Sequence, residues 1–123
     1  FQQKTAYELS LGLLGSEMVI RDSYQALRWF RLAGAQGHVK SQYRVGYALA
    51  HGAGCEIDLQ QAATWLRKAA VNGDPKGQYE FGLLFIHPDY PKRNEEEAFR
   101  WIRLSAIAGF APAQYQLALF YQA

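Results

Sequence analysis

The side chains of this chain that could do covalent or metal chemistry are its one cysteine and its three histidines. Cys55 follows His51 by four residues, the pairing that a cysteine nucleophile and its base would need, but a glycine turn separates them and no third partner accompanies them. His51 and His87 occupy equivalent positions of adjacent helices, about 10 Å apart, too far to share a metal ion without other ligands. We therefore expect no metal site, and we interpret Cys55 as a small, buried apolar residue.

Common catalytic and cofactor motifs do not occur in the sequence. It contains no phosphate loop, no His-Glu-x-x-His, no Cys-x-x-Cys and no Gly-x-Ser-x-Gly. One cysteine cannot form an internal disulfide, so the fold does not depend on an oxidising compartment. We expect a protein that is not an enzyme and that carries no cofactor.

The composition is that of an ordinary globular chain of 123 residues, half of them hydrophobic and a fifth charged. A net charge of +2 is too small to imply a nucleic-acid partner. No apolar run approaches the roughly 18–20 residues that span a bilayer. The chain starts at Phe1, without an initiator methionine or a signal peptide, which indicates a processed protein or a piece of a longer one.

Six sets of residues recur at a spacing of 36 residues, with no insertion or deletion. They are Trp29, Trp65 and Trp101; Ala26, Ala62 and Ala98; Gly37, Gly73 and Gly109; Tyr7, Tyr43, Tyr79 and Tyr115; Gln42, Gln78 and Gln114; and Asp22, Asp58 and Asn94. Chance rarely aligns so many sets, two of which consist of the scarce residues tryptophan and tyrosine. The chain is therefore a tandem array of one repeated unit.

Each unit is predicted to form two helices. In the second copy an apolar stripe runs from Val45 to Gly52 at helical spacing, and a glycine turn follows it. Asp58, with Gln61 three residues later, has the spacing of a capping box at the start of a second helix. Gly73 is suited to the end of that helix, because glycine readily adopts the left-handed conformation found there.

One helical hairpin cannot bury its apolar face, whereas stacked hairpins share a continuous core. The predicted fold is therefore all-α: a right-handed α-solenoid of antiparallel helix hairpins, with three 36-residue repeats plus a terminal helix. We assign residues 1–123 to a single domain. The predicted repeats span about residues 5–40, 41–76 and 77–112, with a partial fourth repeat at 113–123.

Small and large residues have different predicted roles in this stack. Gly46 and Gly82 lie in the middle of helices, where glycine costs about 1 kcal/mol relative to alanine. We expect a neighbouring helix to approach closely at both positions. The three tryptophans are expected to fill the space between helices rather than to stack on a ligand.

The residues from Gln42 to Gly73 carry a recognisable pattern: Gln-Tyr-x-x-Gly, then Gly-x-Gly-Cys-x-x-Asp, then Ala-x-x-Trp-x-x-Lys-Ala-Ala-x-x-Gly. This pattern resembles the Sel1-like repeat, a relative of the tetratricopeptide repeat, and the resemblance covers essentially the whole chain. It implies an adaptor that assembles complexes with another protein. Because many such proteins are bacterial, it also implies a place in a bacterial cytoplasm or periplasm.

The sequence departs from the family pattern in its loops. Cys55 stands where the family usually has valine. The first copy has no glycine turn at residues 16–19, and the third copy has two prolines at residues 88–91. Pro88 is predicted to stop its helix near His87. The two unusual loops are either ordinary loop drift or recognition features.

By analogy with the tetratricopeptide fold, one side of the first helix of each repeat lines a concave groove. The predicted partner-binding residues are Lys40, Tyr43, Arg44, Tyr47, His51, Lys76, Tyr79, Glu80, Leu83, His87, Tyr115 and Leu119. The equivalent residues of the first copy are Lys4, Tyr7 and Leu11. Rings supply contact area for a peptide or a helix, and lysines can pair with acidic groups. The alternative is that the tyrosine row is structural and packs within its own hairpin.

A row of arginines, Arg31, Arg67 and Arg103, recurs on the opposite, convex face. Because the acidic residues 95–97 lie close to the last of them, we interpret this row as a solvated helix face and expect no nucleic-acid partner. The leading hypothesis is a protein–protein interaction scaffold with no membrane span. The alternative is a cell-wall or polysaccharide-associated structural component of a bacterial envelope complex, because tyrosines can also stack on sugar rings.

Overall fold

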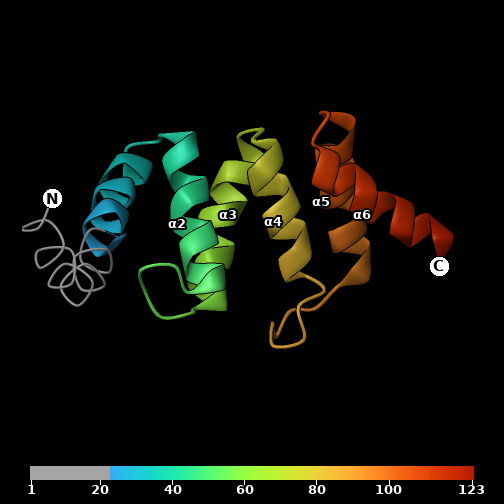
Figure 1. Cartoon of the computed structure of the whole chain (residues 1–123), viewed down its shortest axis with the longest axis horizontal. Coiled ribbons are helices and arrows are strands. Elements are labelled where there is room, and N and C mark those ends of the chain that lie inside the picture. Colours follow the sequence, from blue (N-terminus) through green and yellow to red (C-terminus); the bar gives the residue numbers. More distant parts are fainter. Residues whose placement is uncertain (1–22) are drawn as a thin grey trace, which may run out of the picture.

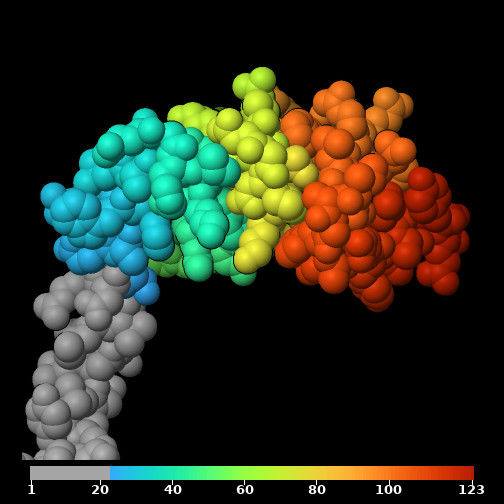
Figure 2. Space-filling view, turned by 90° about the horizontal axis from the view of Figure 1, so that it is seen from above, coloured from blue at the N-terminus to red at the C-terminus, as the bar shows by residue number. Residues whose placement is uncertain are grey.

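The computed structural model describes residues 23–123, and within this range all regular structure is helical. A helix over residues 23–35 is followed by α2 (Val39–His51), α3 (Leu59–Val71), α4 (Pro75–Leu84), α5 (Glu95–Ile107) and α6 (Ala111–Gln122). Each helix packs against the next one along the chain, and the helices stack side by side along the long axis of the molecule (Figure 1). From above, the repeats form a single row from blue to red (Figure 2). The prediction of an all-α solenoid is confirmed.

Two kinds of helix alternate along this row. We call α2, α4 and α6 the A helices, and the helix at 23–35, α3 and α5 the B helices. The core lies between them, with Val45 of α2, Leu66 of α3 and Ile102 of α5 fully buried. Gly52 does not continue the apolar stripe of α2 as predicted. It is exposed, caps the helix with a φ of +75°, and ends it.

Local signals in the sequence place the helix ends. Gly37, Gly73 and Gly109 follow the three B helices with φ values of +99°, +88° and +97°, a conformation that glycine adopts without a steric penalty. Pro75 occupies the first turn of α4, where a helix needs no N–H donor. The left-handed glycine after α3 agrees with the sequence analysis, which assigned that role to Gly73.

The start of each B helix is tied to the end of the preceding A helix. Asp58 accepts a hydrogen bond from the Gln61 N–H at 3.0 Å, which confirms it as the N-cap of α3. Its own N–H donates to the Leu49 carbonyl at 2.9 Å, so the reciprocal half of a capping box is not formed. One repeat later, the Asn94 N–H donates to the Phe85 carbonyl, also at 2.9 Å. The cap residue therefore fixes the return of the chain as well as the helix start.

The prediction that α4 continues to near His87 is wrong, because α4 ends at Leu84. The residues that follow form tighter bonds: the Ile86 N–H donates to Leu83 and the His87 N–H to Leu84, each three residues back. Pro88 explains the early end, because a proline has no N–H and disfavours the helical conformation of the residue before it.

Glycines in the A helices allow close helix packing, as predicted. A Cβ atom at Gly46 would lie 2.5 Å from Leu66 Cγ, and one at Gly82 would lie 2.7 Å from Ile102 Cγ1. Both distances are shorter than a carbon–carbon contact of about 3.5–4.0 Å. The backbones of α2 and α4 therefore rest on buried side chains of the B helices that follow them, α3 and α5.

The interpretation of the tryptophans as core residues holds for two of the three. Trp65 and Trp101 are half-buried and pack against the core, whereas Trp29 is 63% exposed. Trp65 lies over Gly34 of the preceding B helix, where an added Cβ would approach its ring to 2.8 Å.

The glutamine set forms a ladder of hydrogen bonds between repeats. In each case the side-chain Nε2 of an A helix donates to a carbonyl at the end of the preceding B helix. The bonds join Gln42 to Gly34 at 3.1 Å, Gln78 to Ala70 at 3.3 Å and Gln114 to Ala106 at 3.2 Å. Each of these carbonyls also accepts a bond from the glycine N–H three residues later, so the glutamines tie an already closed helix end to the next repeat, and this repeated spacing serves the fold.

The side-chain oxygen of Gln78 lacks the hydrogen-bond donor that the equivalent oxygen of Gln42 has. Gln42 Oε1 accepts from Asn72 Nδ2 at 3.5 Å, whereas Gln78 Oε1 is buried without a partner among the described residues. Ala108 stands in the third repeat where Asn72 stands in the second. We expect Ala108→Asn to raise the free energy of unfolding by about 0.5–1 kcal/mol, because it supplies the missing donor.

Urea denaturation followed by circular dichroism would measure this change. Asn72→Ala is the mirror-image control, and it is expected to destabilise the second repeat because Asn72 Nδ2 also donates to the Lys68 carbonyl at 2.8 Å. A loss of stability in Ala108→Asn would contradict the explanation.

Candidate functional site

The exposed sides of the A helices form a surface that we call the A-helix face. On α2 it carries a column of rings, with centroids 5.9 Å apart between Tyr43 and Tyr47 and 4.2 Å apart between Tyr47 and His51. The four-residue spacing places these rings above one another on one side of the helix. Tyr43 is half-buried, whereas Tyr47 is 39% exposed and His51 is exposed. The outer part of the column is therefore open to a partner.

His51 also joins two repeats. Its Nε2 lies 2.7 Å from Glu80 Oε1 on α4, and Glu80 is only 9% exposed. The prediction of Glu80 as an exposed recognition residue is therefore wrong. A helical periodicity gives the direction of a side chain from its own helix axis, but here the neighbouring α2 covers that side of α4.

The tyrosine row is partly structural. Burial raises the pKa of Tyr43 above its ordinary value, and the Glu80 carboxylate raises it further. Burial also raises the pKa of Tyr79, whose ring meets Phe110 edge-on at 5.4 Å. Tyr115 of α6, at the same position of its repeat, is 68% exposed. The row thus contributes packing in two repeats and open surface in the last one.

The remaining predicted residues of this face differ in exposure. Lys40, Arg44 and Lys76 are exposed and give the face a basic edge, with the Arg44 guanidinium 5.9 Å from the centre of the Phe30 ring. Leu119 is 38% exposed on α6. Leu83 is half-buried and packs against the core cluster around Ile102 and Ala113.

His87 was predicted to lie on this face, but the structure places it elsewhere. It is half-buried in the turn after α4, where its Nδ1 accepts a hydrogen bond from the Asp89 N–H at 3.1 Å. The early end of α4 before Pro88 is the reason. The predicted face residues of the first copy, Lys4, Tyr7 and Leu11, and the first loop at residues 16–19 lie outside the described residues.

Cys55 and His51 have separate partners, so they do not form a catalytic pair. The Cys55 thiol is partly buried and donates to the Ala48 carbonyl at 3.4 Å, whereas His51 contacts Glu80. Burial raises the pKa of Cys55, and the positive charge of Arg31 opposes that shift only in part. A raised pKa disfavours the thiolate, which is the nucleophilic form.

Residues 23–123 contain no group of three or more histidine, cysteine, aspartate or glutamate side chains placed to hold a metal ion. In the same range, no helix is both long and apolar enough to cross a membrane.

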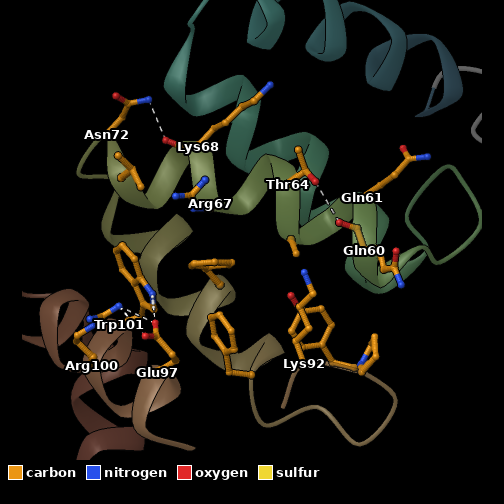
Figure 3. A pocket seen from close by; sticks show the side chains of 16 residues that line it. Gln60, Gln61, Thr64, Arg67, Lys68, Asn72, Lys92, Glu97, Arg100 and Trp101 are labelled. Carbon is orange, nitrogen blue, oxygen red and sulfur yellow. Dashed lines mark hydrogen bonds and ion pairs between the residues drawn. The ribbon is translucent and has the colours of Figure 1, made fainter. Parts of the chain in front are cut away.

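Sequence reasoning missed a groove of about 980 Å³ that lies between α3, α5 and the turn that joins α4 to α5 (Figure 3). We call it the B-helix groove. Arg67 of α3 and Arg100 of α5 line it, together with Tyr90 and Lys92 of the turn. Arg67, a member of the arginine row, and the unusual third loop were both visible in the sequence. Only the fold shows that they border the same space.

Helical hairpins stacked in register define a helical-repeat protein of the solenoid class. Its A helices present the A-helix face, and its B helices border the B-helix groove. The chain belongs to the Sel1 repeat family, whose model matches residues 4–38, 39–74, 75–110 and 111–123. These matches recur with the 36-residue period of the sequence, so the resemblance to Sel1-like repeats is confirmed. Sel1 repeats typically serve as scaffolds for protein–protein interaction.

Among the solved structures that are similar to the chain are two from bacteria. One is a protective antigen of uropathogenic Escherichia coli strains with an SLR fold, 32% identical, with a TM-score of 0.73 over 77% of this chain and 21% of that one. The other is a Sel1 repeat protein from Oxalobacter formigenes, 29% identical, with a TM-score of 0.72 over 80% of this chain and 40% of that one. The chain thus spans less than half of either protein. The comparison with curated proteins found no match.

Proposed function

We propose that the chain is a non-catalytic adaptor that binds an extended peptide or a helix of a partner protein along its A-helix face. The observation that carries this proposal is the ring column of α2. Its outer members Tyr47 and His51 are exposed, and their rings pack against each other. Rigid aromatic side chains that are already positioned lose little conformational freedom on binding, which is why they so often dominate interface energies.

The chemistry of the face indicates the kind of segment that fits. Lys40, Arg44 and Lys76 lie along its edge, and the carboxylate of Glu80 is covered and paired with His51. The face therefore presents rings and positive charge, which suits an apolar segment with acidic residues beside it.

The test starts from a random peptide library displayed against the immobilised full chain. The affinity of each selected peptide is then measured by fluorescence anisotropy for the wild type and for Tyr47→Ala combined with Leu119→Ala. We expect the double variant to bind about 5–30-fold more weakly, because truncating an interface anchor costs about 1–2 kcal/mol.

Leu104→Ala combined with Ile107→Ala is the matched control, since both residues are exposed on α5 and lie outside the A-helix face. Equal binding by the two double variants, with unchanged circular dichroism, would exclude the A-helix face as the binding surface. Sedimentation with peptidoglycan or another polysaccharide, in a chain that selects no peptide, would favour the cell-wall alternative instead.

A further inference from the structure

The floor of the B-helix groove is a set of aromatic rings that hold one another in place. Phe81 meets Phe85 at a centroid distance of 4.9 Å and Trp101 at 5.4 Å, and Phe85 meets Tyr90 at 5.7 Å, all edge to face. Phe85 and Trp101 are half-buried, so part of each ring remains open toward the groove. A floor packed in this way is ready to receive one large apolar side chain without rearrangement.

The rim of the groove is strongly basic although the whole chain is nearly neutral. Its lining holds four cationic side chains, Arg67, Lys68, Lys92 and Arg100, and one carboxylate, Glu97. Both oxygens of Glu97 accept from Arg100 Nη2, at 2.8 and 2.7 Å, so that charge is already compensated. No carboxylate of residues 23–123 lies within salt-bridge distance of Arg67, Lys68 or Lys92.

Polar side chains complete one wall. Gln60 and Gln61 are exposed in the first turn of α3 and line the groove about two helical turns before Arg67 (Figure 3). A glutamine amide both donates and accepts hydrogen bonds, so it can bind the N–H and C=O groups of an extended backbone. The wall opposite, beyond the aromatic floor, is formed by Arg100 and Trp101 of α5.

We infer that the B-helix groove binds an acidic, extended segment of another protein that carries one large apolar side chain. The apolar side chain lies on the floor beside Phe85 and Trp101, and carboxylates of the segment pair with Arg67 on α3 and Lys92 on the turn. This surface is separate from the A-helix face. A chain that uses both binds two segments at once, which is what an assembly scaffold requires.

A single-stranded nucleic acid also seeks positive charge and rings, but the groove favours a peptide. A strand stacks successive bases on open ring faces, whereas two of the four rings of the floor are closed: Phe81 is 5% exposed and Tyr90 is 6% exposed.

The test uses the full chain and a fluorescein-labelled peptide of four glutamates around one phenylalanine. Fluorescence anisotropy gives its affinity for the wild type and for Arg67→Glu combined with Lys92→Glu. We expect this double variant to bind at least about tenfold more weakly, and wild-type binding to weaken as salt is added. A peptide with alanine in place of phenylalanine is also expected to bind more weakly.

Arg28→Glu combined with Arg103→Glu is the control, because it makes the same change in net charge at exposed residues outside the groove. It is expected to bind the peptide like the wild type. No saturable binding, or an equal loss in the two double variants, would overturn the inference. So would an oligothymidylate that binds more tightly than the peptide and is lost with the same groove substitutions.

Discussion

Gly46→Leu is expected to lower the free energy of unfolding by about 3 kcal/mol or more. A Cβ at this position alone would lie 2.5 Å from Leu66 Cγ and Cδ2 and 3.0 Å from the Leu66 backbone nitrogen. Leu66 is fully buried and cannot rotate into solvent, and its backbone nitrogen belongs to α3. A leucine side chain must therefore push α2 and α3 apart.

Gly46→Ala combines two opposed effects on stability, a gain in helix propensity and a loss from overpacking the core. Alanine gains about 1 kcal/mol over glycine in the middle of a helix, whereas overpacking a well-filled core costs about 1–3 kcal/mol. Because the added methyl group alone meets both Leu66 carbons at 2.5 Å, we expect a net loss of stability.

A double-mutant cycle with Leu66→Ala isolates this contact, since that substitution removes the Cγ and Cδ2 atoms that the new methyl group would meet. Urea denaturation of the four variants would measure it. We expect Gly46→Ala to cost about 1 kcal/mol less in the Leu66→Ala background than in the wild type. Additive effects would mean that close helix packing is not what requires the glycine.

Tyr90→Ala is expected to cost about 3–4 kcal/mol, close to the loss for other buried aromatic side chains. Tyr90 lies in the turn between α4 and α5, is 6% exposed, and meets the Phe85 ring edge-on at 5.7 Å. Without the ring, the turn loses its attachment to the core and the B-helix groove loses one end. The midpoint and slope of urea unfolding would measure the loss.

Tyr90→Phe is the matched control, because the Tyr90 hydroxyl makes no hydrogen bond to a described residue and the ring is kept. Burial raises the pKa of Tyr90 above its ordinary value of 10.0. The folded chain therefore holds this proton more tightly than the unfolded chain, so stability is fully present below pH 10 and falls as the pH rises through the folded-state pKa. Tyr90→Phe is expected to reduce that fall. A large loss of stability at neutral pH in Tyr90→Phe would contradict the ring-packing explanation.

The repeat, its helices and most of their ends could be predicted from the sequence because they depend on local or periodic signals, although α4 ends earlier than its pattern indicated. Gly73 takes the left-handed conformation after α3, and Asp58 caps the start of that helix by accepting a hydrogen bond from the N–H of the residue three positions later. The 36-residue period then implies a stack, because a hairpin alone leaves its apolar stripe exposed. The close approach at Gly46 followed from the same reasoning.

The surfaces could not be predicted in the same way, because they depend on what lies across the boundary between repeats. Glu80 has the periodicity of an exposed residue, yet α2 covers it and His51 binds it. His87 has the spacing of a face residue, yet the proline after it ends the helix early and moves it into a turn. Helical periodicity predicts the side of the helix on which a side chain lies, but it does not predict which residues of the adjacent helices contact that side chain.

Two features of the sequence, Arg67 of the arginine row and the proline-flanked third loop, gain a meaning only in three dimensions. Packing of α4 between α3 and α5 brings Arg67, Lys92 and Arg100 around one aromatic floor, although they are spread over more than thirty residues of the chain. Local propensity determines a helix within a few residues. A groove forms where three such elements meet, and its shape depends on long-range packing that no single segment encodes.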